Sequence, residues 1–223
     1  MFELTHPGSE AGGRAESDHY PTPPLLAKRG VQLALELHGL RAIPLFLVEP
    51  GCGDRAPFCR WALDAGMVAR GIEARDIDPP TFPDIAEEQV WEGFRFSGGA
   101  DYLTMEKPDE RADLIVTNPP FSLAEEFVRR AIEKWVTPTG LVVMLLKTSF
   151  EASNDRREFW RKHPAIFRYV IRPRPGFTGS GNDSGEYAFF VWPGPALGRK
   201  LSRIGRAWCE TRYIDNDGPW RKA

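Results

Sequence analysis

The sequence predicts one α/β domain whose mostly parallel sheet is covered by helices on both faces. Short apolar runs alternate with segments of helical periodicity, a pattern typical of parallel strands joined by helices. With 223 residues, 42% of them hydrophobic, the chain is long enough to bury the core of one such domain. Six runs are predicted strands: IPLFLVE, ARGIEARD, ADLIVT, LVVMLLK, FRYVIRP and YAFFVW, at residues 43–49, 69–76, 112–117, 141–147, 167–173 and 187–192.

The first predicted helix follows the proline-rich stretch YPTPP. Prolines suit the first turn of a helix, and four leucines recur at the spacing of one helical face: Leu26, Leu33, Leu37 and Leu40. The residues before this stretch are rich in Gly, Ser, Glu and Ala and have no apolar period, so we expect them to be flexible. The predicted divisions are a flexible arm over 1–19, a folded domain over 20–192 and a tail of unassigned structure over 193–223.

Composition argues against several classes of protein. No segment is apolar over the length that crosses a membrane, and the N-terminus lacks the apolar stretch of a secretory signal. We therefore expect a cytoplasmic protein. The four histidines are scattered and predict no catalytic role. Neither a disulfide framework nor a metal site is expected, because the three cysteines form no C-x-x-C pair: Cys52, Cys59 and Cys209.

Charge is divided unevenly along the chain. The net charge is -2, but the residues from Glu151 onward carry 14 Lys and Arg against 8 Asp and Glu, a balance of +6. The first 150 residues therefore carry -8. A basic C-terminal third suits a polyanionic partner, and it is equally compatible with a solvated surface.

A glycine-rich turn follows the first predicted strand, in the stretch FLVEPGCGDRAPF. The strand ends at Glu49, and Gly51 and Gly53 allow the backbone to approach a ligand closely. A helix is expected to begin near Pro57. Such a turn also serves tight packing alone. Arg55 stands where a third glycine would be placed, which disfavours a dinucleotide pyrophosphate site.

Acidic residues follow further predicted strands. Asp76 ends the run GIEARD, 27 residues after Glu49, a separation that fits one intervening helix. At the end of the second strand of such a fold, a carboxylate can accept hydrogen bonds from two ribose hydroxyls. Asp101, in SGGADYLTM, follows another expected strand. Each acid taken alone is also an ordinary turn residue.

The stretch TNPPF at residues 117–121 directly follows the apolar run DLIV. Pro119 and Pro120 end the strand and stiffen the chain, so Asn118 is held extended at the carboxyl edge of the sheet, where ligands bind. The Asn118 amide oxygen and the Pro119 carbonyl offer two acceptors to an exocyclic NH2 group. Phe121 offers a ring on which a planar base stacks. A turn with a buried phenylalanine is the alternative.

In this order, the motifs resemble the class I S-adenosylmethionine-dependent methyltransferases that modify amino groups, over residues 20 to about 192. DLIVTNPPF is similar to their (N/D/S)-P-P-(Y/F/W) motif, and VEPGCGD to their methionine-binding loop. YPTP resembles the segment that closes over the cofactor in adenine-N6 methyltransferases. Asp76 matches the ribose-binding acid, and Asp101 matches the residue that contacts adenine.

The resemblance implies a Rossmann-like fold with a seven-stranded sheet whose last strand is antiparallel, and S-adenosylmethionine as the cofactor. It implies catalytic roles for Asn118, Pro119, Pro120 and Phe121. It implies cofactor contacts from Tyr20, Thr22, Pro23, Glu49, Pro50, Gly51, Cys52, Gly53, Asp76, Ile77, Asp101, Tyr102 and Asn118.

The implied reaction is methyl transfer to an exocyclic amino group, first of all N6 of adenine in DNA, as in the phage and bacterial enzymes of this type. In-line transfer from a sulfonium depends on alignment more than on a strong base, so no nucleophilic side chain is expected. Methylation of adenine N6 or guanine N2 in RNA, or of glutamine N5 in protein, is also compatible with NPPF. A cofactor- or nucleic-acid-binding scaffold with a vestigial site is the non-enzymatic alternative.

Substrate contacts are expected from Phe121, Arg172 and Arg174, although solvated arginines are an equal alternative. The segment 156–162 interleaves basic and aromatic residues, which suits either a nucleic-acid-facing helix or a helix with an aromatic core face. No recognition domain fits between the motifs, since only 26 residues separate Glu49 from Asp76. We therefore expect salt-sensitive backbone binding with low sequence specificity.

Overall fold

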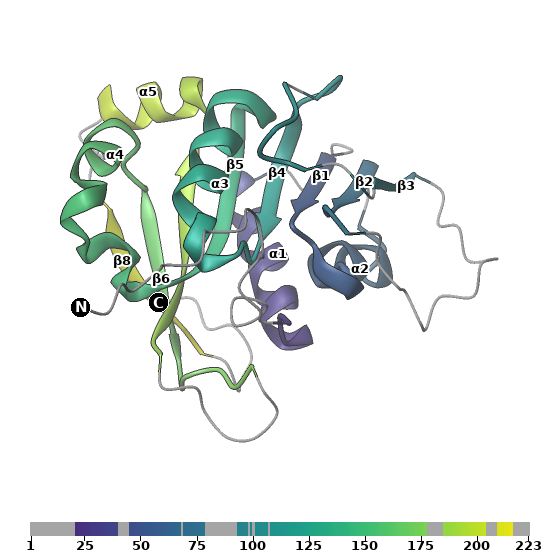
Figure 1. The fold of residues 1–223 in the computed structure, drawn as a ribbon, viewed down its shortest axis with the longest axis horizontal. Helices are drawn as coiled ribbons and strands as arrows, with labels where there is room; N and C mark the ends of the chain where they lie inside the picture. Colours follow the sequence, from purple (N-terminus) through teal and green to yellow (C-terminus); the bar gives the residue numbers. More distant parts are fainter. Residues whose placement is uncertain are drawn as a thin grey trace, which may run out of the picture.

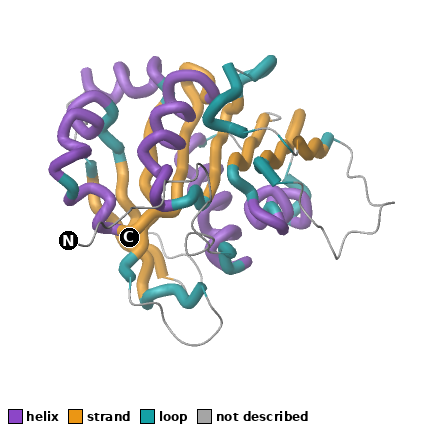
Figure 2. Tube along the Cα trace, viewed as in Figure 1, coloured by secondary structure: helices purple, strands orange, loops and turns teal. Residues whose placement is uncertain are grey.

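A computed structural model describes residues 21–39, 45–67, 69–78, 93–97, 99, 101–106, 108–177, 185–203 and 209–215. One mixed sheet runs through the molecule with helices packed around it (Figure 1 and Figure 2). Its strands are β1 (Leu45–Pro50), β2 (Ala69–Arg75), β3 (Phe94–Ser97), β4 (Ala112–Thr117), β5 (Val136–Lys147), β6 (Phe167–Arg172), β7 (Tyr187–Pro193) and β8 (Glu210–Asp215). The α-helices are α1 (Pro24–His38), α2 (Pro57–Asp64), α3 (Ala124–Arg130), α4 (Arg157–Lys162) and α5 (Pro195–Arg203).

Short helical turns complete the described elements. Four are 3-10 turns: η2 (Gly53–Arg55), η3 (Phe121–Leu123), η5 (Thr148–Ala152) and η6 (Asn154–Arg156). The fifth, η4 (Ala131–Trp135), is a π turn that continues α3. Helices α1 and α2 begin at Pro24 and Pro57, as the prolines predicted.

The strand order is β3-β2-β1-β4-β5-β7-β6-β8. β7 runs antiparallel to β5 and β6, and the other neighbouring strands are parallel. The order reverses between β1 and β4, which lie side by side with Leu47 opposite Leu114. Ligands of open α/β sheets bind at the carboxyl ends of the strands beside such a reversal. The topology therefore predicts a ligand site at the loops that follow β1 and β4.

The six predicted strands are all present, and β7 has the antiparallel direction expected of the last strand. The predicted number of seven is wrong, because the described residues form eight strands. The additional strand, β8, comes from the tail and pairs with β6 in parallel, Phe167 opposite Glu210. Its sequence gives little signal because it is a short edge strand with Tyr213 exposed and Ile214 buried.

Alternate residues of the central strands face two apolar layers. Leu45 and Leu47 of β1 belong to the layer that holds α1 and α2. Phe46 and Val48 belong to the opposite layer, which holds α3 and the π turn. Because both faces are covered, the strands are apolar at nearly every position, which is why they appear in the sequence as unbroken runs.

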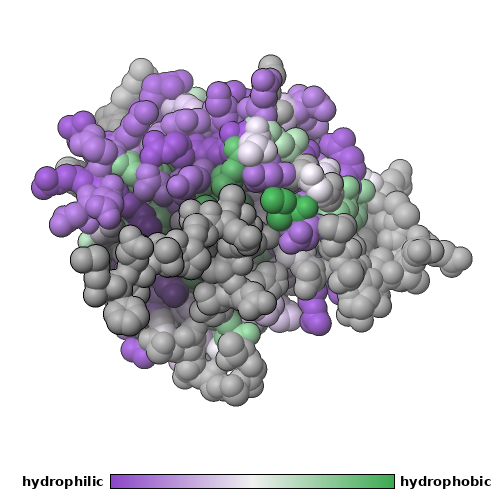
Figure 3. Space-filling view, viewed as in Figure 1, coloured by the Kyte–Doolittle hydropathy of each residue, from purple (hydrophilic) through white to green (hydrophobic). Residues whose placement is uncertain are grey.

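The segment 156–162 contains α4, whose aromatic residues belong to the core. Phe159 is buried, and the Trp160 ring lies 5.6 Å from that of Phe150 and 5.9 Å from that of Trp192. The charged residues point outward, and this face is largely hydrophilic in Figure 3. Of the two expectations for this helix, the structure supports an aromatic core face. None of the described helices combines the length and apolar character needed to span a membrane.

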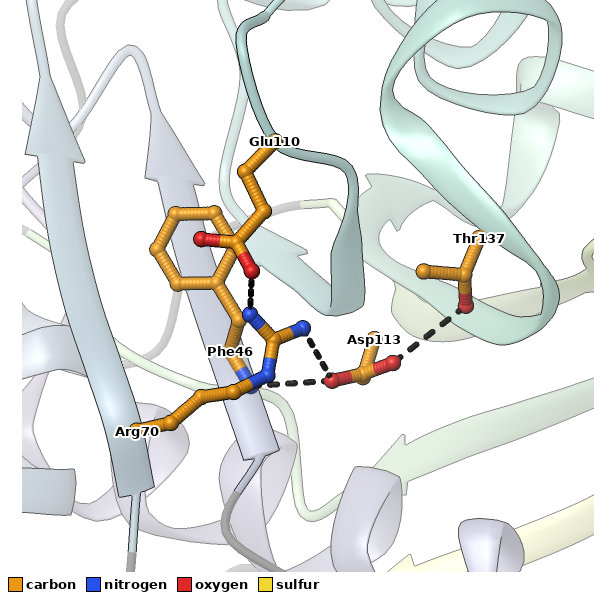
Figure 4. A network of polar contacts seen from close by, with 5 residues as sticks. All are labelled: Phe46, Arg70, Glu110, Asp113 and Thr137. Atoms are coloured by element: carbon orange, nitrogen blue, oxygen red, sulfur yellow. Dashed lines mark hydrogen bonds and ion pairs between the residues drawn. The ribbon is translucent and has the colours of Figure 1, made fainter.

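A polar network fastens the amino edge of the sheet, opposite the loops that follow β1 and β4 (Figure 4). Asp113 accepts hydrogen bonds from the Phe46 backbone N–H at 3.0 Å and from Arg70 Nη2 at 2.9 Å. The Thr137 hydroxyl contacts its other oxygen at 3.4 Å, and Arg70 also pairs with Glu110. Four strands are thus joined through one carboxylate.

We expect Asp113→Ala to lower the free energy of unfolding by about 1–3 kcal/mol, because it leaves a strand N–H without its charged acceptor. Urea denaturation followed by circular dichroism measures this. The matched control is Glu110→Ala, which removes the other carboxylate that pairs with Arg70. Its side chain is 51% exposed, so the expected loss is about 1 kcal/mol or less. Equal losses in the two variants would contradict a special role for Asp113.

Candidate functional site

A cavity of about 490 Å³ opens at the carboxyl edge of the sheet, beside the reversal between β1 and β4. This volume lies within the range of small-molecule sites. Its walls come from the segment before α1, the loops after β1, β2 and β4, one side of α2, and the chain after β6. The lining residues are Pro21, Thr22, Pro23, Pro24, Glu49, Gly51, Cys52, Gly53, Arg55, Pro57, Arg60, Trp61, Asp64, Asp76, Asn118, Pro119, Pro120, Phe121, Gly176 and Phe177.

The glycine-rich turn forms the floor between β1 and α2. Gly51 and Gly53 have φ angles of 65° and 61°, which side-chain-bearing residues rarely adopt. A Cβ on Gly51 would also lie 3.1 Å from the ring of Phe127, so the turn rests directly on α3. Arg55 lines the cavity, and Ala56 after it has φ of 40°, a left-handed conformation that is uncommon for alanine. The two glycines suit the turn, whereas the fold holds Ala56 in a conformation that alanine alone does not favour.

Asp76 connects the ends of β1 and β2. Its carboxylate is buried, accepts the Gly53 N–H at 2.7 Å and accepts the Asp78 N–H at 3.2 Å. The backbone N–H of Cys52 donates to Arg75 O at 3.0 Å and reinforces the same junction. A carboxylate fixed by backbone donors at a cavity wall is well placed to accept hydroxyl groups of a ligand.

Glu49 is a buried acid at the base of the cavity, only 1% exposed. Its Oε2 accepts the Cys59 N–H from α2 at 2.8 Å. Burial, the largest cause, raises the pKa of Glu49 to about 8, although the Cys59 N–H acts in the opposite direction. Near neutral pH this carboxyl group therefore holds a proton in the protein without ligand.

Asn118 follows β4 and contacts the segment before α1. Its Nδ2 donates to Thr22 Oγ1 at 3.0 Å, across 96 residues of sequence. Pro119 and Pro120 are buried, and Thr117 Oγ1 donates to Pro50 O at 2.6 Å. The four residues of the NPPF motif all line the cavity.

Phe121 lies beside the last residue of β5 and the first residue of β7. Its ring centroid is 5.8 Å from that of Tyr187 and 5.1 Å from Lys147 Nζ. Lys147 and Tyr187 are opposite one another in the β5–β7 ladder, so the sheet itself fixes both neighbours. Phe121 is partly exposed, which leaves ring surface at the cavity wall.

Several predicted cofactor contacts lie elsewhere. Tyr20 is outside the described residues. Ile77 is 48% exposed and Pro50 belongs to β1; neither lines the cavity. The Asp101 side chain accepts the Leu103 N–H at 2.8 Å within its own turn, and it does not line the cavity either.

Tyr102 is the clearest correction. Its side chain is 3% exposed, and its ring packs 5.1 Å from Phe127 and 4.9 Å from Trp135. The apolar pocket under α3 therefore takes this ring away from the cavity. Among the predicted substrate contacts, Arg172 and Arg174 lie outside the cavity lining, at the exposed end of β6.

Sequence reasoning missed the contribution of α2 and of the chain after β6. Pro57, Trp61 and Asp64 lie on one helical side at spacings of four and three, and that side lines the cavity. This spacing was a usable signal. Gly176 and Phe177 gave none, because only the fold brings them to the site. The described residues include no group of His, Cys, Asp and Glu arranged to hold a metal ion.

Comparison with solved structures identifies the fold. No family model matches the sequence, and no curated protein matches it significantly. The candidate class I S-adenosylmethionine-dependent methyltransferase lmo1582 of Listeria monocytogenes has a TM-score of 0.66 over 94% of this chain and 70% of its own, at 14% identity. PH1948 of Pyrococcus horikoshii is described as a candidate RNA methyltransferase. Its TM-score is 0.62 over 82% of this chain and 89% of its own, at 15% identity. ErmE, a 23S rRNA methyltransferase, has a TM-score of 0.54 over 83% of this chain and 75% of its own, at 18% identity.

This chain has the class I methyltransferase fold. At such low identities the likeness concerns the fold alone. The eight-stranded sheet, with β7 antiparallel between β5 and β6, agrees with the Rossmann-like arrangement that the sequence predicted.

The raised pKa of Glu49 generates a test of stability against pH. The folded protein binds this proton more tightly than the unfolded chain, in which the pKa of Glu49 is near 4.5. The contribution of Glu49 to stability is therefore full below pH 4.5 and is lost as the pH rises toward 8. Glu49→Gln keeps an acceptor for the Cys59 N–H and cannot ionise. We expect the ligand-free variant to be more stable than the wild type at pH 8, by about 1–3 kcal/mol.

The gain should shrink toward pH 4.5, which urea denaturation at several pH values measures. Glu126→Gln, an exposed change on α3, is the matched control and should give no such pH-dependent gain. A variant that is no more stable at pH 8 than the wild type would show that Glu49 ionises at little cost.

Proposed function

We propose that this protein is an S-adenosylmethionine-dependent methyltransferase that acts on an exocyclic amino group. One observation carries the proposal: the NPPF motif, the glycine-rich turn and the Asp76 carboxylate line one continuous cavity. A methyl donor and an amine acceptor must meet within about 3 Å for in-line transfer, and a shared cavity permits this. The fold of the chain and of the solved structures that resemble it supports the same assignment.

The cavity fits the proposed cofactor in its chemistry. Asp76 suits ribose hydroxyls, and the left-handed glycines of the turn let a ligand approach the backbone. Glu49, ionised, would face the ammonium group of the methionine portion, and a buried carboxylate needs such a partner. When bound, S-adenosylmethionine supplies an electrophilic methyl group on a sulfonium sulfur.

The residues around the acceptor would act by alignment. The Asn118 amide oxygen and the Pro119 carbonyl accept the two N–H groups of the target amine, which directs the nitrogen lone pair away from the ring. Phe121 stacks on the target base. The bound cofactor would supply the methyl group, and the proton that the methylated amine must lose would pass to water. No strong base is required for these steps.

We propose N6 of adenine in DNA as the target, with low sequence specificity. Only 26 residues separate Glu49 from Asp76, so no recognition domain fits between these two motifs, and phosphate contacts by arginine carry no sequence information. A base must leave the stack to enter such a cavity, which is the usual solution for enzymes that modify bases. RNA is the second candidate, because PH1948 is described as a candidate RNA methyltransferase and ErmE as a 23S rRNA methyltransferase.

Transfer of a tritiated methyl group tests the proposal directly. The purified protein is offered plasmid DNA, total RNA and a protein extract in parallel, and labelled nucleosides are identified after digestion. We expect label in N6-methyladenine of DNA, distributed over many sequence contexts. Label in RNA or in glutamine would redirect the substrate assignment, and label in none of the three would favour a binding scaffold.

Two substitutions should separate binding of the cofactor from chemistry. We expect Asp76→Ala to weaken S-adenosylmethionine binding by about 1–3 kcal/mol, through loss of charge-assisted hydrogen bonds. Asn118→Ala should bind the cofactor normally and lose most turnover. Calorimetry and single-turnover kinetics measure the two effects. Normal turnover in the Asn118 variant would remove the NPPF amide from the mechanism.

Arg172 and Arg174 are proposed to contact the phosphates of the substrate. Arg172 ends β6 and Arg174 follows it, both are exposed, and the chain continues to the cavity residues Gly176 and Phe177. The Arg172 guanidinium lies 4.7 Å from the exposed ring of Tyr213. A guanidinium beside an exposed aromatic ring suits a nucleic acid strand that runs toward the cavity.

For the double change Arg172→Ala and Arg174→Ala, we expect weaker DNA binding at low salt and a slope of log affinity against log salt reduced by up to about 2. Fluorescence anisotropy at several salt concentrations measures the slope, and cofactor affinity should not change. Arg161→Ala on α4, another exposed arginine, is the control. A reduced slope in the control alone would move the binding surface to α4.

A further inference from the structure

The hydrogen bond between Asn118 and Thr22 joins two parts of the cavity that are far apart in sequence. Nδ2 of Asn118 donates to Thr22 Oγ1 at 3.0 Å, and both residues line the cavity. Thr22 immediately precedes Pro23, whose carbonyl accepts the N–H groups of Leu26 and Ala27 at 2.9 and 3.1 Å. Leu26 and Ala27 belong to α1, and both side chains are buried in the core. The threonine is therefore held by a helix that is itself fixed in the core.

The direction of this hydrogen bond matters for an amide. Its two ends are nearly the same in shape and opposite in chemistry, since the oxygen accepts and the NH2 group donates. If the amide NH2 group faced the target amine, two hydrogen-bond donors would face each other and no hydrogen bond could form. Alignment of the amine thus requires the oxygen on that side and the nitrogen on the other. A hydroxyl can accept from the nitrogen or donate to the oxygen, and here it accepts from the nitrogen, which anchors the side chain in the orientation that the structure shows.

We infer that Thr22 is a positioning residue: its hydroxyl, which accepts the Asn118 NH2 group, holds the amide side chain in place at the cavity wall for alignment of the substrate amine. This inference rests on the proposed function. It gives Thr22 a role distinct from cofactor contact, and it makes alignment of the substrate depend on the segment that precedes α1. The Thr22 hydroxyl acts through Asn118 and touches no reacting atom.

Three variants test the inference by kinetics. Thr22→Val has the same shape and no acceptor, so we expect kcat to fall about 5- to 10-fold, the value of one net hydrogen bond. KM for the nucleic acid and the dissociation constant of S-adenosylmethionine should change by less than about twofold. Thr22→Ser restores the hydroxyl and should restore kcat. Thr137→Val removes a hydroxyl at the opposite edge of the sheet, and its kcat should equal that of the wild type.

A second readout needs no activity. The side-chain amide signals of Asn118 in a ¹H–¹⁵N spectrum are assigned by their loss in Asn118→Asp. In Thr22→Val, one of these two proton signals should move upfield, and in Thr22→Ser both should stay near their wild-type positions. Unmoved signals in Thr22→Val would overturn the hydrogen bond, and moved signals with unchanged kcat would overturn its role in alignment.

Weakened cofactor binding with unchanged kcat would assign Thr22 to the cofactor instead and would also overturn the inference. A wild-type protein that methylates no acceptor would end the proposed function and the alignment role together. Even in that case the spectrum decides separately whether Thr22 orients the Asn118 amide.

Discussion

The site depends on the parallel pairing of β1 with β4 at the centre of the sheet. These strands are 67 residues apart at their paired positions, yet their carboxyl ends meet. The Thr117 hydroxyl fastens them there, because it donates to the Pro50 carbonyl at 2.6 Å in a fully buried position. A buried hydroxyl and a carbonyl at a strand end each need a partner, and each satisfies the other. The turn after one strand and the NPPF motif after the other are thereby held as neighbours.

Much of this arrangement could be predicted from the sequence, because buried parallel strands are apolar throughout and their ends carry the unusual residues. The runs that lead to Glu49, Asp76 and Asn118 located three cavity residues in this way. β8 could not be predicted, since an edge strand buries only one side of a few residues. Tyr102 was misplaced because a tyrosine beside a predicted site residue gives no indication of which way its ring turns.

The hydrogen bond from Asn118 to Thr22 could not be predicted from the sequence either. Both residues were candidates for cofactor contact, and Asn118 also for catalysis, but only the fold shows that they touch. The same holds for Glu49, whose position at the end of a strand suggested a ligand contact and gave no hint of a protonated carboxyl group. Burial decides that property against the opposing effect of the Cys59 N–H, and both come from the packing of α2 on β1.

Gly51 has a consequence for how relatives of this protein are judged. Its left-handed φ and the Phe127 ring 3.1 Å from a Cβ position each disfavour larger residues, whether or not the protein binds a ligand. A homologue that has lost all activity would still be more stable with glycine there. Asn118 has no such double requirement, since its side chain lines a cavity. An inactive descendant should therefore keep the glycine and drift at the asparagine, so the asparagine is the better marker of a working enzyme.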